Sequence, residues 1–293
     1  MLRVLAILGL AVCLAVYPAK AQEAAGAASP EIWTPPDWVK ATMDVAYGEG
    51  AAHRLDVYTP LRGSEGKRPG VLLIHGGGWR SGSRKSVARV HALPFLEKGF
   101  VVAAIDYRLS DEAKAPAAVS DTLQALDWFH RNAKLLQEDR DRIITAGYSA
   151  GAHLALLAGM VDKKAKLGPT SDVAAIINCY GAADLSEQLT RKEAEGARAW
   201  LPTGAEGVEM SRVVSPITYV RKGLPPVKSI HGTEDPTVPY EQSVRLTRSL
   251  RRVGVTAELL SIPGAKHGFE EAVWHNEVYP QVFEFLTRQK VLR

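Results

Sequence analysis

Short runs of apolar residues alternate along this chain with longer stretches of helical periodicity, and this alternation limits the folds it can adopt. The apolar runs lie at 53–58, 71–74, 101–105, 142–146, 173–180, 227–230 and 257–262. The helical patterns lie at about 84–98, 116–135, 150–161, 240–253 and 275–289. Continuous apolar runs indicate strands that are covered on both faces, as in a parallel sheet. The sequence therefore predicts an α/β fold, with helices flanking a mostly parallel central sheet.

The composition suits a soluble catalytic or binding domain with a sizeable core. Of 293 residues, 46% are hydrophobic and 23% are charged, which excludes global disorder. No sequence repeat with a period of about 20–50 residues is present, so a solenoid or propeller is not expected. Lysine and arginine exceed aspartate and glutamate by 36 − 32 = 4, and they are scattered. Nucleic-acid binding needs a basic stripe, so no nucleic-acid partner is expected.

Residues 1–21 have the pattern of a secretory signal peptide. Arg3 supplies a positive charge, and the apolar run after it is too short to cross the ~30 Å hydrocarbon core of a bilayer comfortably. Ala19 and Ala21 are small residues at the two positions that a signal peptidase reads. We expect cleavage between Ala21 and Gln22, a periplasmic or secreted protein, and no stable membrane anchor.

An uncleaved anchor helix and a lipoprotein modified at Cys13 are the alternatives for this segment. The short apolar run disfavours the first, and Val12 before the cysteine, where a small residue is expected, disfavours the second. Residues 22–36 are rich in Ala, Pro and Ser and are expected to form a flexible lead-in. The catalytic domain is then expected over 37–293.

A serine lies in a sharp turn between a predicted strand and a predicted helix. Residues 147–151 read G-x-S-x-G, directly after the strand at 142–146. Glycine is needed on either side because a β-carbon would clash in so tight a turn. The serine hydroxyl then projects from the sheet at the positive N-terminus of the following helix. We predict that Ser149 is a nucleophile; the alternative is a turn residue that only caps the helix.

A glycine-rich loop, HGGGW at 75–79, follows the strand at 71–74. Consecutive glycines leave backbone N–H groups open to an oxygen atom, which suits the oxyanion of acyl transfer. The N–H of Ala150, the residue after the serine, would complete an oxyanion hole. The alternative is a merely flexible loop. His75 precedes the serine in the chain, so we interpret it as a residue that organises the loop rather than as a base.

Acidic residues and a histidine follow the later strands, where a base and its partner are needed. Asp235 and Glu234 follow the strand at 227–230, and Asp184 follows the strand before it. Each can orient a histidine by its chemistry, so the residues alone leave three candidates. His267 lies in a glycine-flanked loop after the last strand and completes the chain order serine, acid, histidine. We predict that it is the general base.

Other chemistry-bearing residues point to no further site. No His/Cys/Glu cluster has metal-ligand spacing, and no G-x-G-x-x-G or P-loop motif is present, so neither a metal nor a cofactor is expected. Cys179 lies in an apolar run and is expected to be a buried hydrophobic residue. The aromatic residues Trp79 and Tyr148 flank the two motifs. They are candidate walls of a substrate pocket, or else they pack inward as core residues.

These motifs together resemble those of the α/β-hydrolase superfamily, and more narrowly those of BD-FAE-like and hormone-sensitive-lipase-like bacterial esterases. The matching pieces are HGGGW at 75–79, DYRL at 106–109, GYSAGAH at 147–153, HGTEDPTVP at 231–239 and GAKHGF at 264–269. The resemblance implies that the acid is Asp235, the fifth residue of the family pattern H-G-x-x-D-x-x-V-P. It also implies that Gly77 and Gly78 donate to the oxyanion.

The chain departs from many hormone-sensitive-lipase-like enzymes because its start is too short for their N-terminal helical cap. Its one sizeable insertion, at about 184–222, is expected to form a small helical lid. This difference favours the BD-FAE-like group.

The resemblance implies a serine carboxylic-ester hydrolase that works through an acyl-enzyme. Esters of short or aromatic acyl groups, free or linked to polysaccharide, are the expected substrates. Alternatives are an amidase of the kynurenine-formamidase type, which shares HGG-x-W, and a prolyl-oligopeptidase-like peptidase. The signal peptide disfavours the former, and the lack of a propeller disfavours the latter. A catalytically inactive binding module is disfavoured because all the catalytic parts are present.

Overall fold

The structure, a computed structural model, describes residues 33–62 and 66–293. The predicted signal peptide at 1–21 lies outside the described residues, as does the lead-in at 22–36 except for its last four residues. Within the described ranges, none of the helices combines the length and the apolar character needed to cross a membrane.

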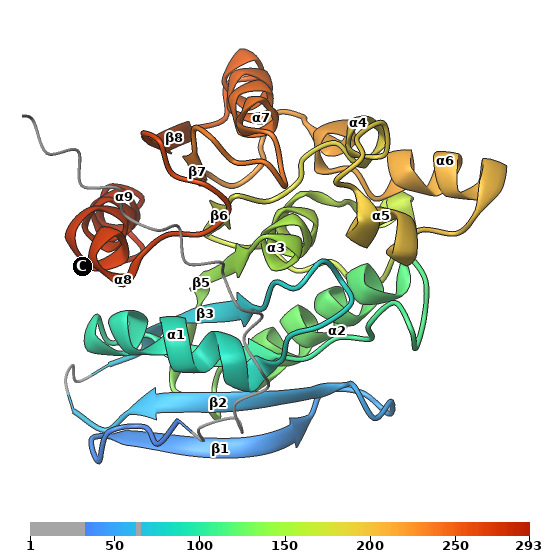
Figure 1. Cartoon of the computed structure of the whole chain (residues 1–293). Helices are drawn as coiled ribbons and strands as arrows, with labels where there is room; N and C mark the ends of the chain where they lie inside the picture. Colours follow the sequence, from blue (N-terminus) through green and yellow to red (C-terminus); the bar gives the residue numbers. More distant parts are fainter. Residues whose placement is uncertain (1–32, 63–65) are drawn as a thin grey trace, which may run out of the picture. The chain divides into compact units, whose positions relative to one another are not determined.

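The described residues contain one eight-stranded sheet, with strand order β1-β2-β4-β3-β5-β6-β7-β8 (Figure 1). The strands are β1 (Val39–Ala46), β2 (Arg54–Pro60), β3 (Arg68–Ile74), β4 (Val101–Ile105), β5 (Glu138–Tyr148), β6 (Ala175–Cys179), β7 (Val227–Gly232) and β8 (Ala257–Ile262). β1 and β2 are antiparallel to each other, and β2 is antiparallel to β4. All other neighbours are parallel, which confirms the predicted mostly parallel sheet.

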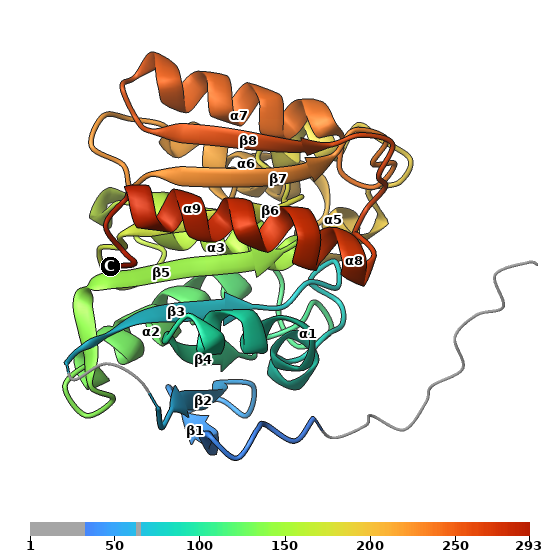
Figure 2. The same ribbon diagram turned by 90° about the vertical axis from the view of Figure 1, so that its left-hand side faces the viewer.

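Helices cover both faces of this sheet. One layer contains α1 (Arg84–Glu97) and α9 (Tyr279–Arg288), which lie in front of the strands in Figure 2. The other layer contains α2 (Ala117–Asn132), α3 (Ala150–Met160) and α7 (Tyr240–Arg252). In β3, Val71 and Leu73 pack with the first layer, whereas Leu72 and Ile74 pack with the second. Because both faces are buried, this strand reads as a continuous apolar run.

Two parts of the fold have weaker sequence signals. β1 was not expected, because only Val39 among its eight residues is buried and it lies at an edge of the sheet. Between β6 and β7 the chain forms α4 (Leu185–Gln188), α5 (Glu195–Trp200), α6 (Gly204–Val213) and the short 3₁₀ helix η2 (Pro216–Tyr219). These helices lie in the segment where a helical lid is expected. The remaining short elements are η1 (Lys163–Ala165), α8 (Glu271–Val273) and a π-helix, η3 (Trp274–Val278).

At the start of β5 the side chain of Glu138 is buried without a partner. The residue is 1% exposed, and neither carboxyl oxygen has a hydrogen-bond partner within the described chain. Burial raises the pKa of this carboxyl from 4.5 to about 9. At neutral pH Glu138 is therefore protonated, and ionising it in the folded protein costs free energy.

Replacing Glu138 with glutamine is expected to stabilise the protein more at pH 8 than at pH 5. An acid whose pKa is raised by folding contributes full stability below its unfolded pKa, and that stability is lost as the pH rises towards the folded pKa. Between pH 5 and pH 8, the difference in free energy of unfolding between Glu138→Gln and wild type should grow by on the order of 1–3 kcal/mol. Urea denaturation at both pH values measures it. A difference that does not change with pH would mean that the carboxyl is ionised in the fold.

Candidate active site

Ser149 lies in the tight turn that joins β5 to α3. Its backbone has φ 55° and ψ −120°, a strained conformation for a residue with a side chain. A β-carbon at Gly147 would lie 2.2 Å from the carbonyl oxygen of Gly151, and one at Gly151 would lie 2.2 Å from that of Ile74. Both glycines are therefore required by the turn. The Ser149 N–H donates to the carbonyl of Cys179 on β6 at 2.9 Å, which fixes the turn to the sheet.

The structure brings Ser149, His267 and Asp235 together. His267 Nε2 is 2.7 Å from Ser149 Oγ, and His267 Nδ1 is 2.7 Å from Asp235 Oδ2. The carboxylate can only accept, so Nδ1 carries the proton and Nε2 accepts from the serine hydroxyl. Asp235 follows β7 and His267 follows β8, so both stand at the carboxyl ends of parallel strands, as Ser149 does.

Asp235 is held from several sides. The N–H groups of Thr237 and Val238 donate to its Oδ1 at 2.8 and 2.9 Å. His231 Nε2 lies 3.2 Å from its Oδ2, the oxygen that faces His267. Burial acts to raise the pKa of this carboxyl, but the N–H groups of His231, His267 and Val238 outweigh it and hold the pKa well below its ordinary value. Asp235 is therefore an anion over the whole working pH range.

The other two acidic candidates lie elsewhere. Asp184 caps α4, where its side chain accepts from the N–H groups of Ser186 and Glu187 at 3.0 and 3.1 Å. Glu234 is exposed. Of the three candidates, Asp235 alone is hydrogen-bonded to His267.

The glycine loop lies against Ser149. A β-carbon at Gly76 would approach that of Ser149 to 3.2 Å, and Gly77 and Gly78 have φ values of 113° and 60° that favour glycine. Ala150 is the first residue of α3 and is buried beside Ser149. The backbone of Gly76 therefore lies against Ser149, and Gly77 and Gly78 line the same cavity as Ser149.

His75 organises this loop, as its sequence position suggested. Its ring stacks on Tyr107 with centroids 4.2 Å apart, and Tyr107 Oη donates to the His75 carbonyl at 3.0 Å. The ring Nδ1 donates to the carbonyl of Gly76 at 2.7 Å. Burial lowers the pKa of His75, so the ring is neutral and serves as a packed support.

A cavity of about 400 Å³ opens over Ser149 and His267. The glycine loop forms one wall, and Tyr180 and Val238 contribute another. The insertion supplies a third wall, which combines small side chains on and beside α5 with Glu193 and with Gln188 of α4. Sequence reasoning missed Gln188 and the α5 wall because nothing local marks them. Tyr180 directly follows β6, and that position at a strand end was the available signal.

Trp79 and Tyr148 both line this cavity and both pack inward. Trp79 is 5% exposed and stacks on Trp200 of α5, with ring centroids 4.7 Å apart. Tyr148 is 6% exposed and stacks on His91 at 3.5 Å. Burial lowers the pKa of His91 to about 3, so this ring is neutral. Each of the two residues is therefore a core residue that also forms part of the cavity wall, so both alternatives left open by the sequence apply.

The insertion touches the glycine loop closely. A β-carbon at Gly196 would lie 3.0 Å from the carbonyl oxygen of Gly78, so the backbones meet here with no side chain between them. Arg80 pairs with Glu195 at 3.2 Å beside this contact. Together with the stacked tryptophans, these contacts join α5 to the loop.

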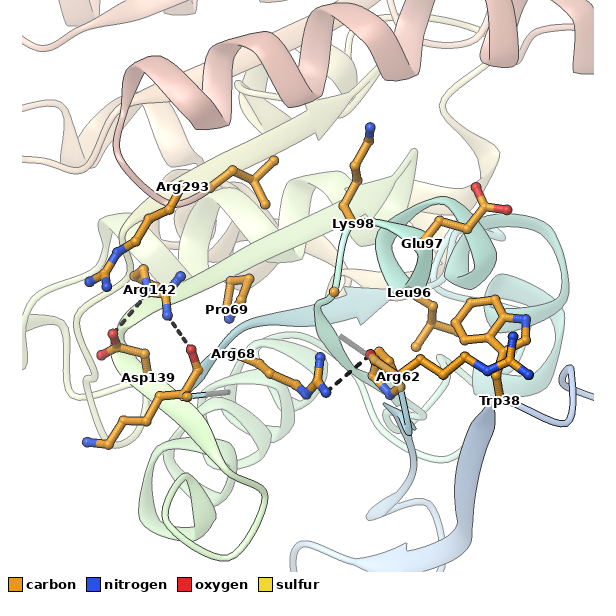
Figure 3. Close-up of a pocket in the computed structure, with 15 residues that line it drawn as sticks. Trp38, Arg62, Arg68, Pro69, Leu96, Glu97, Lys98, Asp139, Arg142 and Arg293 are labelled. Carbon is orange, nitrogen blue, oxygen red and sulfur yellow. Dashed lines mark hydrogen bonds and ion pairs between the residues drawn. The ribbon is translucent and has the colours of Figure 1, made fainter. Parts of the chain in front are cut away.

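A larger hollow, of about 930 Å³, lies at the amino ends of the strands (Figure 3). Arg62, Arg68, Lys98, Arg142 and Arg293 give it a basic lining. Arg142 is engaged with Asp139 at 2.9 Å and with the carbonyl of Lys67, and Arg68 with that of Arg62. The hollow is at the opposite end of β5 from Ser149, and among the residues that the structure describes none that lines it is a serine or a histidine. We therefore place the chemistry in the smaller cavity.

The part of the chain that the structure describes holds no group of three or more His, Cys, Asp or Glu side chains placed to bind a metal ion. Cys179 is buried and its thiol is free. Burial raises the pKa of this thiol well above its ordinary value, so it is not a competing nucleophile.

A strained serine after the central parallel strand β5, with an acid after β7 and a histidine after β8, defines an α/β-hydrolase fold. Residues 55–250 match the sequence model of the BD-FAE family. The chain belongs to this family of α/β-hydrolase-type esterases.

Several curated relatives are named as esterases. Esterase LipC of Mycobacterium tuberculosis is 31% identical over 243 residues, which covers 77% of this chain and 59% of LipC. Isoprenylcysteine alpha-carbonyl methylesterase of Arabidopsis thaliana is 27% identical over 238 residues, with 76% and 55% of the two chains covered. The chain therefore spans less than two thirds of the length of these relatives.

Solved structures of similar fold match over most of their length. A truncated form of a carbohydrate esterase from gut microbiota has a TM-score of 0.76 and 25% identity, covering 85% of this chain and 96% of that one. The apo form of Thermogutta terrifontis esterase 2 has a TM-score of 0.75 and 28% identity, covering 90% and 98%.

Proposed function

We propose that this protein is a serine carboxylic-ester hydrolase. The observation that carries the proposal is the continuous hydrogen-bonded path from Ser149 through His267 to Asp235, with 2.7 Å at each step. This path opens into a cavity, and the glycine loop lies beside it. The names of the relatives, which are esterases, point to the same class of reaction.

In the proposed reaction, His267 Nε2 takes the proton of Ser149 as Oγ attacks the ester carbonyl. The N–H groups of Gly77, Gly78 and Ala150 stabilise the oxyanion. The imidazolium, stabilised by Asp235, then protonates the leaving alcohol. Water, activated by the same histidine, hydrolyses the acyl-enzyme and returns the serine to its starting state. No cofactor is needed for any of these steps.

The test is hydrolysis of p-nitrophenyl esters together with labelling by a fluorophosphonate probe. We expect turnover and one equivalent of label on Ser149. A similar structure, Thermogutta terrifontis esterase 2, is titled as phosphorylated by paraoxon, an organophosphorus compound of related chemistry. Folded protein that neither turns over esters nor takes up label would instead be a binding module with a hydrolase fold.

Short or aromatic acyl groups are the proposed substrates. Trp79 lines one side of the cavity of about 400 Å³ and is backed by the stacked ring of Trp200, which limits the depth of the cavity on that side. The similar structure from gut microbiota is that of a carbohydrate esterase, which supports esters linked to polysaccharide as the natural form. Comparing acetylated xylan and methyl ferulate with simple p-nitrophenyl esters tests this choice.

We expect kcat/KM to be highest for acyl chains of about two to four carbons and to fall by about eight. A shallow cavity buries only a few methylenes, each worth ~0.8 kcal/mol, and a longer chain gains nothing further. Trp79→Ala should move the optimum to longer chains by removing a wall. Ala197→Leu, which adds bulk on the α5 side of the cavity, should move it to shorter ones. An optimum at eight carbons or more in the wild type would contradict a shallow pocket.

Export is proposed from residues 1–21 alone. Expressed with its own leader in a Gram-negative host, the mature protein is expected to begin at Gln22 because Ala19 and Ala21 form the cleavage site. Intact mass spectrometry measures this directly. Retention of Met1, or a lipid on Cys13, would contradict a cleaved signal peptide.

A further inference from the structure

A second histidine, His231, lies behind the acid of the proposed triad. It is the penultimate residue of β7 and is fully buried. Its Nε2 is 2.9 Å from the carbonyl oxygen of Val238 and 3.2 Å from Asp235 Oδ2. Its Nδ1 is 2.7 Å from the hydroxyl of Ser243 on α7. No step of the proposed reaction uses this ring.

The neighbours of His231 decide where its proton is. A carbonyl oxygen only accepts hydrogen bonds, so Nε2 carries the proton and donates it to Val238. The ring Nδ1 is then an acceptor for the Ser243 hydroxyl. The same Nε2–H group also faces Asp235 Oδ2, so the partial positive charge of its hydrogen lies next to the carboxylate. From the elements around the ring, the titratable groups that face it are Asp235 and Tyr240, whose ring packs edge-on with centroids 5.9 Å apart.

His231 thereby holds both ends of the Asp235 carboxylate. Through its bond to the Val238 carbonyl it fixes the residue whose N–H holds Oδ1 at 2.9 Å. Directly, it faces Oδ2, the oxygen that accepts from His267 Nδ1 at 2.7 Å. The orientation of the carboxylate, and through it that of the His267 ring, depends on both contacts.

We infer that His231 is a positioning residue for the reaction: its Nε2–H sets the carboxylate of Asp235 in the orientation that aligns His267 with Ser149. The inference rests on the proposed function and adds to it. An imidazole displaced by about 1 Å from its working position costs on the order of 10²-fold in rate. The effect falls on kcat, because His231 does not line the substrate cavity.

Two variants distinguish the effect of the Nε2–H donor from the effect of removing the imidazole ring. Glutamine at this position can place an amide N–H near that of Nε2, whereas the shorter asparagine reaches only the Nδ1 position. His231→Gln should keep kcat within about fivefold of wild type, and His231→Asn should lose roughly 10²-fold with KM changed less than about twofold. The kcat of each variant is normalised to the fraction of Ser149 that reacts with the fluorophosphonate probe.

His53→Asn is the matched control. His53 is also a buried histidine whose Nε2 meets a buried carboxylate, Asp121, at 3.0 Å, but it lies beside β2, away from the cavity. Its replacement should lower the melting temperature and leave the normalised kcat unchanged. If His231→Asn behaves in the same way, or if the glutamine and asparagine variants lose kcat equally, the donor has no positioning role.

Proton and nitrogen NMR of the wild type give a readout that needs neither turnover nor a folded variant. In the wild type, His231 should be protonated on Nε2 and not on Nδ1; the opposite tautomer would overturn the inference. The low-field resonance of His267 Nδ1–H should persist in His231→Gln and be shifted or lost in His231→Asn. Absence of ester turnover and probe labelling in the wild type would count against the proposed function, whereas an unmoved resonance would count against His231.

Discussion

Ser149→Ala is expected to fold like the wild type and to lose about 10⁶-fold in kcat for ester hydrolysis, the scale reported when a triad serine is removed. The change deletes the one oxygen that His267 Nε2 contacts at 2.7 Å and leaves the β-carbon in place. Alanine keeps the strained φ of 55°, so the turn between Gly147 and Gly151 is preserved.

Ester turnover and fluorophosphonate labelling, with circular dichroism for the fold, measure this result. Ser120→Ala on α2 is the matched control, because its hydroxyl makes only a 3.4 Å contact to the carbonyl of Pro116 within its own helix. Turnover of Ser149→Ala at the wild-type rate, with an unchanged spectrum, would show that another residue is the nucleophile.

Asp235→Asn is expected to reduce kcat by on the order of 10⁴-fold with little change in structure. Asparagine can retain the bonds from the Thr237 and Val238 N–H groups to Oδ1, because its carbonyl oxygen accepts as the carboxylate does. The NH₂ group of the asparagine then takes the place of Oδ2 and offers His267 Nδ1 a hydrogen-bond donor instead of an acceptor. The imidazole responds by carrying its proton on Nε2, the tautomer that cannot accept from Ser149.

The other acidic candidates provide controls for this variant. Glu234→Gln changes an exposed side chain and should leave kcat unchanged. Asp184→Asn alters the cap of α4 and should affect stability by about 1 kcal/mol or less, with little effect on kcat. Loss of 10⁴-fold in Asp184→Asn, with Asp235→Asn active, would place the acid after β6 instead of β7.

The sequence predicted the parts of the site that depend on local geometry. The turn around Ser149 needs glycine at 147 and 151 because backbone oxygens leave no space for a β-carbon, and such a need is visible in the residues themselves. The continuous apolar runs likewise revealed the buried parallel strands. The choice of Asp235 over Glu234 was different, since it came from a family pattern rather than from the residues alone.

What the sequence did not predict depends on contacts between distant segments. The α5 wall exists because the insertion folds back on the glycine loop, and no local signal encodes that return. The place of His231 behind Asp235 depends on Val238 and Ser243, which reach it from the following loop and helix. β1 was missed because an exposed edge strand has no apolar run to mark it.

The close approach of Gly196 to Gly78 constrains which substitutions and segment exchanges this fold can accept. With 3.0 Å between a β-carbon at 196 and the facing carbonyl oxygen, even a methyl group there would require the glycine loop or α5 to shift by a few tenths of an ångström. The stacked Trp79 and Trp200 add a second match between the two segments. A chimera that borrows the 184–222 segment from a relative is therefore expected to need the 75–79 loop of the same donor, because the two segments must fit each other.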